Sequence, residues 1–373
     1  MKYATLYLHI PYCKQACHYC DFHFSTVRST ENEVVERMLR ELAEGQSTWS
    51  EFEFSSLYFG GGTPSILAPE LLECFINRAF ALYHLQEDAE ITLEANPDDI
   101  TLERLAQWHR IGINRLSVGL QSFDNGELTI INRAHRAEHS QQCLQWIYES
   151  PFENYTVDLM YGIPGSTVES WKEQLHTLAS FRPPHLSCYA LTVEKKTVLH
   201  HQVKSGEISP PADDIIVKQF EVLDQWANDH GYTHYELSNF AQPGMHSSHN
   251  SHYWTGAPYL GIGPGAHSFD GTRRWWNISN NAFYAQGANP TEELLSPQDI
   301  LHERLMVRLR TAVGFRWEDD FPTELGRAER FVLEQEVARA VAQGELVTKE
   351  TGFTIPTERW MESDRIIAQL FLD

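Results

Sequence analysis

The sequence has 373 residues, of which 42% are hydrophobic, enough for one large core and a smaller appended domain. Its 29 basic and 51 acidic side chains give a formal net charge of −22. This charge argues against nucleic acid as a partner and allows at most a weak membrane association, through a local basic pair such as Arg273 and Arg274. No apolar run approaches the roughly 18–20 residues of a membrane span, and no signal peptide opens the chain, so a cytoplasmic protein is predicted.

Strand patterns alternate with helical patterns over the first half of the chain. Runs rich in β-branched, aromatic or leucine residues predict six strands, over 4–10, 56–59, 89–94, 115–121, 155–161 and 186–192. A capping box at 30–33 predicts a helix that stops near Gly45, and further helices are predicted over 69–83, 101–111, 137–149 and 167–180. Six β-α repeats predict an α/β fold whose parallel sheet curls into a partial (β/α)6 TIM-like barrel.

The second half of the chain changes character twice. A helix near 213–230 is followed by a stretch, 236–281, that is dense in glycine, histidine, asparagine and aromatic residues. Helices then return at 300–310 and 328–343, with a hairpin pattern over 344–355 and a last helix running to Asp373, which together predict a winged-helix-like unit. We therefore expect a core barrel over 1–235, a connecting segment that closes it over 236–295, and a C-terminal helical domain over 296–373.

Three cysteines, Cys13, Cys17 and Cys20, follow the first predicted strand with the spacing C-x-x-x-C-x-x-C. Three thiolates on one loop can hold three irons of a [4Fe–4S] cluster and leave the fourth iron open to a cofactor such as S-adenosylmethionine. A Cys₃His zinc site is the alternative, since three histidines lie close by: His9, His18 and His23. The other cysteines stand singly in apolar surroundings and predict buried thiols in a reducing compartment: Cys74, Cys143 and Cys188.

Further candidates lie at the ends of the predicted strands. Glycines 60–62, followed by Thr63 and a proline, would let a backbone approach a ligand closely, or would simply turn the chain. Glu94, Gln121 and Asp158 come late in their strands, where a parallel barrel places its chemistry. The alternative is that some of these side chains only satisfy a neighbouring loop.

These motifs together resemble the radical S-adenosylmethionine superfamily, and within it the group of the coproporphyrinogen III dehydrogenase HemN and the haem chaperone HemW. The matching segments follow one another along nearly the whole chain: 7–13, 60–64, 94–97, 115–123, 133–135, 158–165 and 249–254. The resemblance implies that Cys13, Cys17 and Cys20 ligate the [4Fe–4S] cluster. It also implies a set of residues around S-adenosylmethionine: Tyr7, Tyr19, Gly61, Gly62, Thr63, Glu94, Gln121, Arg133, Asp158 and Ala190.

Within that set, Arg133 would pair with the cofactor's carboxylate, a charge-assisted contact that suits guanidinium, unless it forms an ordinary surface salt bridge. Gly61, Gly62 and Thr63 would contact the methionine end, and Ala190 would lie by the adenine.

The sequence departs from the decarboxylase at two places. Where that enzyme has a fourth cysteine, two positions after the third, this chain has Phe22, as HemW-like proteins do. Only twelve residues precede Cys13, whereas the decarboxylase carries a long N-terminal extension. We therefore expect a haem chaperone that passes haem to an acceptor protein. Oxidative decarboxylation of coproporphyrinogen III in porphyrin biosynthesis is the alternative, and whether the chain is an enzyme stays open.

Haem requires an axial nitrogen, a flat apolar wall and cations for its propionates. His249 or His252 could supply the nitrogen, and Tyr253 and Trp254 the wall. The basic pair at 273 and 274 could meet the propionates. Alternatively, this aromatic segment only packs the open end of the barrel.

Overall fold

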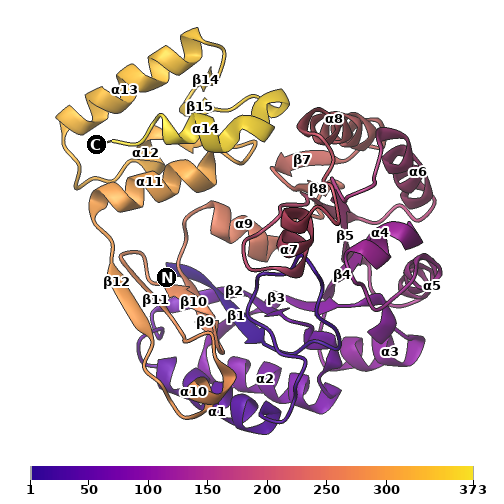
Figure 1. The fold of residues 1–373 in the computed structure, drawn as a ribbon. Coiled ribbons are helices and arrows are strands. Elements are labelled where there is room, and N and C mark those ends of the chain that lie inside the picture. The colour runs from indigo at the N-terminus through magenta and orange to yellow at the C-terminus, as the bar shows by residue number, and fades with distance from the viewer. Residues whose placement is uncertain (1, 373) are drawn as a thin grey trace.

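The computed structural model describes residues 2–372, and its centre is a curved sheet of parallel strands (Figure 1). Six strands follow the order of the chain: β1 (Lys2–Ile10), β2 (Phe52–Gly61), β3 (His84–Ala95), β4 (Arg115–Gln121), β5 (Asn154–Tyr161) and β6 (His185–Ala190). The helices between them cover the outer face: α1 (Glu31–Gly45), α2 (Pro69–Leu82), α3 (Leu102–Arg110), α4 (Asn125–Ile130), α5 (Ala137–Tyr148) and α6 (Val168–Ala179). All six predicted strands are confirmed, each somewhat longer than its pattern or of equal length, apart from the sixth, which ends earlier.

Alternation along the strands separates the core from the interior of the barrel. In β1, Leu6 and Leu8 are fully buried in the large hydrophobic core, where α1 contributes Val34 and Met38. Successive side chains of a strand point to opposite faces, so the residues that alternate with these leucines, Thr5, Tyr7 and His9, face the interior of the barrel. The barrel therefore has an apolar outer layer under its helices and a polar inner face that is available for a site.

The sheet continues beyond the six strands on both edges, giving twelve strands in total over the described residues. At one edge β9 (Tyr259–Ile262) pairs in parallel with β1, and the antiparallel strands β10 (His267–Phe269), β11 (Arg273–Trp276) and β12 (Thr291–Leu294) follow. At the other edge β8 (Asn239–Ala241) and β7 (Thr233–Glu236) extend the sheet antiparallel to β6. Helices α7 (Val198–Ser205), α8 (Asp213–Asp229), α9 (Ser248–Trp254) and α10 (Asn281–Ala285) lie between these strands.

The C-terminal part forms a smaller layer of helices beside a three-stranded sheet (Figure 1). Its elements are α11 (Pro297–Arg308), β13 (Phe315–Arg316), α12 (Trp317–Asp320), α13 (Arg327–Ala342), β14 (Val347–Lys349), β15 (Gly352–Thr354) and α14 (Ser363–Ala368). The predicted hairpin is confirmed as β14 and β15. The last helix ends at Ala368 rather than Asp373, and Asp373 itself lies outside the described residues. Over residues 2–372, no helix has the length and apolar character that crossing a membrane requires.

Two local predictions are wrong. Thr30 precedes α1, but its side chain caps no backbone amide, because its hydroxyl is bonded instead to the Tyr12 hydroxyl 3.1 Å away. Cys74 is exposed on the outside of α2, whereas Cys143 and Cys188 are buried as predicted. Hydrophobic neighbours in sequence predicted burial for Cys74, but the helix turns that position away from the sheet.

Candidate functional site

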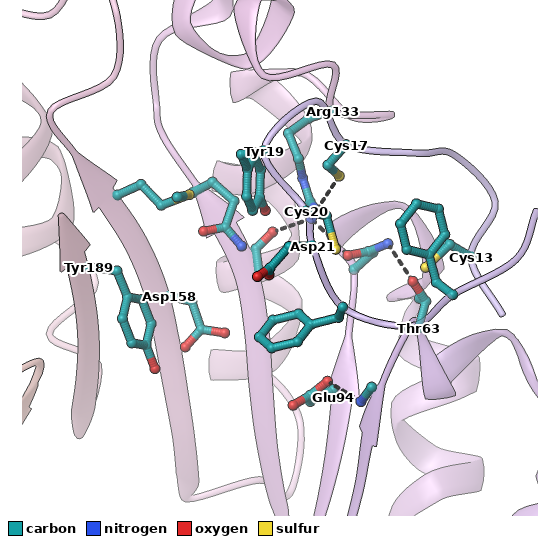
Figure 2. Close-up of a pocket in the computed structure, with 18 of the residues that line it drawn as sticks. Cys13, Cys17, Tyr19, Cys20, Asp21, Thr63, Glu94, Arg133, Asp158 and Tyr189 are labelled. Carbon is teal, nitrogen blue, oxygen red and sulfur yellow. Dashed lines mark hydrogen bonds between the residues drawn. The ribbon is translucent and has the colours of Figure 1, made fainter. Parts of the chain in front are cut away.

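A cavity of about 440 Å³ lies at the carboxyl ends of the parallel strands (Figure 2). It brings together residues from the cysteine loop, the glycine turn and four strand ends. Every residue predicted to surround the cluster or the cofactor lines it, except Tyr7: Cys13, Cys17, Tyr19, Cys20, Gly61, Gly62, Thr63, Glu94, Gln121, Arg133, Asp158 and Ala190. Tyr7 lies within the barrel instead, with its hydroxyl 3.3 Å from His9 Nδ1.

The cysteine loop is fastened to the turn that follows α4. The Gln15 amide donates to the Asn132 carbonyl at 2.9 Å, and the Asn132 amide donates to the Ala16 carbonyl at 2.7 Å. The backbone of His18 also donates to the Ile131 carbonyl at 3.1 Å. These contacts hold the three cysteines along one wall of the cavity, opposite Asp158 and Tyr189 (Figure 2).

The three cysteine thiols of the loop are available as ligands for iron. Cys13, Cys17 and Cys20 are all half-buried and free. Burial raises the pKa of Cys13 and brings that of Cys20 to about 11, so both hold protons that iron binding would displace. Among the described residues no three His, Cys, Asp or Glu side chains converge on one metal ion.

The glycine turn is docked against the start of the cysteine loop. The backbone of Gly62 donates to the Ile10 carbonyl at 2.8 Å, and that of Thr63 donates to the Tyr12 carbonyl at 2.7 Å. A Cβ at Gly62 would lie 2.7 Å from the Tyr12 carbonyl oxygen, closer than real Cβ contacts allow. Glycine is therefore required here for a close approach of two backbones.

Arg133 reaches from the turn after α4 into the cavity. One terminal nitrogen lies 3.3 Å from Cys17 Sγ, and the other donates at 2.7 Å to both the Asn96 side chain and the Gly119 carbonyl (Figure 2). Its Nε is buried without a partner. An unpartnered guanidinium N–H beside a cavity suits an anionic ligand group such as a carboxylate. The alternative of a surface salt bridge does not apply, because these contacts are all to neutral groups inside the barrel.

Two carboxyl groups face the cavity from inside the barrel. Glu94 accepts from the Tyr58 hydroxyl at 2.9 Å and from the Gly61 amide at 3.2 Å, and Asp158 accepts from the Ser117 hydroxyl at 3.1 Å. Loss of solvation raises the pKa of Glu94 to about 7 and that of Asp158 to about 6. Both groups are thus poised to accept hydrogen bonds from a polar or cationic ligand, which would favour their charged forms.

Several cavity residues escaped the sequence analysis. Asn96 donates to the Thr63 hydroxyl at 3.3 Å and accepts from Arg133, so it joins the glycine turn to the arginine. Its place after Glu94 in a matching segment was the available signal. Ser117 of β4 and Tyr189 of β6 also line the cavity. Phe22, which the sequence analysis noted only as a departure from the decarboxylase, lines it too and is 70% exposed.

The residues predicted to bind haem lie apart from the cavity. None of His249, His252, Tyr253 and Trp254 lines it, because α9 packs against β1 and β2. His249 is only 1% exposed, and its Nδ1 lies 2.8 Å from the Ser56 hydroxyl. His252 is half-buried, with Nε2 3.0 Å from the Ser55 hydroxyl. Each imidazole keeps one buried nitrogen without a partner, Nε2 of His249 and Nδ1 of His252.

The two arginines predicted to meet haem propionates are already paired with acids. Arg274 donates to both carboxylate oxygens of Glu303 at 2.6 Å. Arg273 lies 3.4 Å from Asp270 and 3.5 Å from Glu292. These pairs neutralise the one basic patch suggested by the sequence.

The chain is similar in sequence and in fold to known radical SAM proteins. The radical SAM superfamily profile matches residues 7–178. The chain is 34% identical to radical S-adenosyl methionine domain-containing protein 1, mitochondrial, of Mus musculus, over 98% of this chain and 87% of that protein. It is 32% identical to the heme chaperone HemW of Bacillus subtilis, over 83% of this chain and 84% of that protein. Its fold matches the solved structure of coproporphyrinogen III oxidase HemN from Escherichia coli, a radical SAM enzyme, with a TM-score of 0.83 and 21% identity over 99% of this chain and 90% of that one.

Proposed function

The chain belongs to the HemN and HemW group of the radical SAM superfamily, and from this membership we propose that it is a haem chaperone. In this proposal it holds a [4Fe–4S] cluster and S-adenosylmethionine in the cavity, binds haem, and passes haem to an acceptor protein. The observation that carries the proposal is the wall of the cavity at Phe22, where the decarboxylase would have a fourth cysteine. Relatives named as haem chaperones, which match over most of their length, support it.

In this proposal, different cavity residues bind the cluster and the different groups of S-adenosylmethionine. The three cysteines hold the cluster, and Arg133 meets the carboxylate of S-adenosylmethionine with its unpartnered Nε. Glu94 and Asp158 accept hydrogen bonds from the hydroxyl and amino groups. When bound, the cluster and cofactor supply one-electron chemistry, and the protein's part is to orient the cofactor and keep bulk water from it. The carboxyl groups at Glu94 and Asp158 can also take up or release a proton near neutral pH.

Haem contact through α9 rests on its two histidines. A haem iron needs a neutral imidazole nitrogen without another partner, and each of His249 and His252 has one. His252 is the more accessible of the two, because His249 lies inside the barrel. We therefore propose that haem reaches His252 first, and that contact with His249 requires α9 to move.

The first test concerns the cluster. Protein reconstituted anaerobically should contain four irons and four sulfides, and Cys17→Ala should lose most of this content. Cys74→Ala is the matched control, since Cys74 is an exposed cysteine on α2. A Cys17→Ala protein with its full iron content would remove Cys17 from the ligand set.

The second test separates the chaperone from the enzyme. Reconstituted protein is titrated with haem, mixed with apomyoglobin as a probe acceptor, and transfer is followed by absorbance, with His252→Ala as the comparison. The same protein is incubated with coproporphyrinogen III, S-adenosylmethionine and a reductant. Stoichiometric haem binding without protoporphyrinogen formation supports the proposal. Release of carbon dioxide with protoporphyrinogen formation would make the chain a decarboxylase instead.

A further inference from the structure

An aromatic stack runs through the barrel below the cavity, and none of its rings lines the cavity itself. The rings of Tyr7 and Tyr58 are stacked with centroids 5.9 Å apart, and those of Tyr58 and His249 with centroids 4.6 Å apart. Tyr58 is the middle member and is only 8% exposed. The stack joins β1, β2 and α9, elements almost 250 residues apart in the chain.

The hydroxyl of Tyr58 connects this stack to the cavity. It donates to Glu94 Oε1 at 2.9 Å, while the Gly61 amide donates to the other carboxylate oxygen. Gly60 leaves room for the contact, because a Cβ there would lie 2.7 Å from the Tyr7 ring, 2.9 Å from the Tyr58 ring and 3.0 Å from Glu94. Both carboxylate oxygens of Glu94 therefore accept a hydrogen bond, and one of the two donors, the Tyr58 hydroxyl, belongs to the aromatic stack.

Hydrogen bonds also fix the position of the His249 imidazole. Its Nδ1 is bonded to the Ser56 hydroxyl, and its backbone amide donates to Glu90 at 2.9 Å. Glu90 also accepts from the Ser248 amide at 2.9 Å, so a carboxylate of β3 secures the start of α9 within the barrel. Any displacement of α9 would therefore remove the ring that supports one face of Tyr58.

We infer that Tyr58 is a positioning residue that links helix α9 to the cofactor cavity: its hydroxyl fixes Glu94, and the imidazole of His249 fixes its ring. This inference rests on the proposed binding of S-adenosylmethionine in the cavity, and it assigns to His249 an effect on that cofactor although His249 does not touch it. Energetic coupling between two sites is carried by contiguous packed side chains and hydrogen bonds, and the contacts from His249 through Tyr58 to Glu94 are of that kind.

The test measures S-adenosylmethionine affinity in cluster-reconstituted protein by equilibrium dialysis. Tyr58→Phe keeps the ring and removes only the hydroxyl, and it should weaken binding about tenfold, as loss of a hydrogen bond to a charged group does. Tyr83→Phe is the matched control: its buried hydroxyl donates to the Leu42 carbonyl at 2.6 Å, away from the cavity, and its affinity should equal the wild type.

The variants at His249 test the second half of the link. His249→Ala removes the supporting ring and should weaken binding several-fold, whereas His249→Phe retains a flat ring and should stay within about twofold of the wild type. In the Tyr58→Phe background, His249→Ala should have almost no further effect. That non-additivity distinguishes a link through Tyr58 from a general loosening of the barrel, for which the two losses would add.

The outcomes are separable. Tyr58→Phe with wild-type affinity, or losses from Tyr58→Phe and His249→Ala that add fully, would overturn the inference and leave the proposed function standing. A wild-type protein with its full cluster that binds no S-adenosylmethionine would overturn both. A tenfold loss in Tyr58→Phe, absent in Tyr83→Phe and shared with His249→Ala, is the expected result.

Discussion

Binding of S-adenosylmethionine should weaken as the pH falls, because Glu94 must be ionised to accept hydrogen bonds with both oxygens. Burial raises the pKa of Glu94 to about 7. A group with this pKa is roughly nine-tenths ionised at pH 8 and roughly one-tenth ionised at pH 6. When only the ionised form binds, apparent affinity scales with the ionised fraction, so the dissociation constant should rise about tenfold between pH 8 and pH 6.

The assay compares wild type with Glu94→Gln at pH 6, 7 and 8 by equilibrium dialysis. The α-amino group of the ligand also titrates in this range, as does Asp158, whose pKa is raised to about 6. Both contributions are common to the two proteins, so the ratio of their pH dependences isolates Glu94. Glu94→Gln should bind more weakly at pH 8 and lose the extra tenfold dependence. Equal pH dependence in the two proteins would refute the role of the Glu94 carboxylate.

Three further outcomes are expected. In cofactor-free protein, Glu94→Gln should raise the free energy of unfolding at pH 8 by up to about 3 kcal/mol and leave it unchanged near pH 4.5. The reason is that a carboxyl group whose pKa is raised by folding lowers the stability of the folded protein as the pH climbs from 4.5 to about 7. Urea unfolding at both pH values checks this. Gly62→Ala should lose iron because its Cβ meets the Tyr12 backbone, while Gly112→Ala, strained at φ 99° but with open space around it, should keep its cluster on iron analysis. Arg133→Lys should weaken S-adenosylmethionine binding at least tenfold in dialysis, because ammonium cannot reproduce the guanidinium fork; wild-type affinity would show that charge alone suffices.

The parts of the fold that sequence predicted are those set by local patterns. Each parallel strand is a short apolar run with a breaker close behind it, and each helix between strands repeats a buried face, so their periods identify them. The cysteine loop and the glycine turn were found for the same reason, since their residues are close in sequence. Thr30 shows the limit of local patterns. Its pattern predicts an N-cap, but its hydroxyl is bonded to the hydroxyl of Tyr12, eighteen positions earlier in the chain, and not to a backbone amide of the helix.

Other features depend on contacts that no local pattern encodes. β9 is four residues long and pairs in parallel with β1 across about 250 residues, so its register follows from the closed fold rather than from its own sequence. Asn96 is informative only once Thr63 and Arg133 lie on either side of it. α9 has seven residues, too few for a helical period to stand out from a glycine-rich neighbourhood.

The position of α9 changes how the proposed haem residues relate to the cofactor. The sequence groups His249 and His252 with a flat aromatic wall, as though the four residues faced one ligand together. In the fold, His249 points into the barrel beneath Tyr58, while His252 contacts Ser55, the neighbour of the serine that holds His249. β2 is bulged at this point, since Phe54 pairs with Ala4 while Ser56 pairs with the next residue, Thr5, so both serines meet α9, on which the two histidines are about one helical turn apart. The difference between the histidines is burial, because His249 is 1% exposed inside the barrel whereas His252 is only half-buried. Haem that binds while α9 keeps this arrangement therefore meets His252 alone, and haem affinity should fall in His252→Ala but not in His249→Ala.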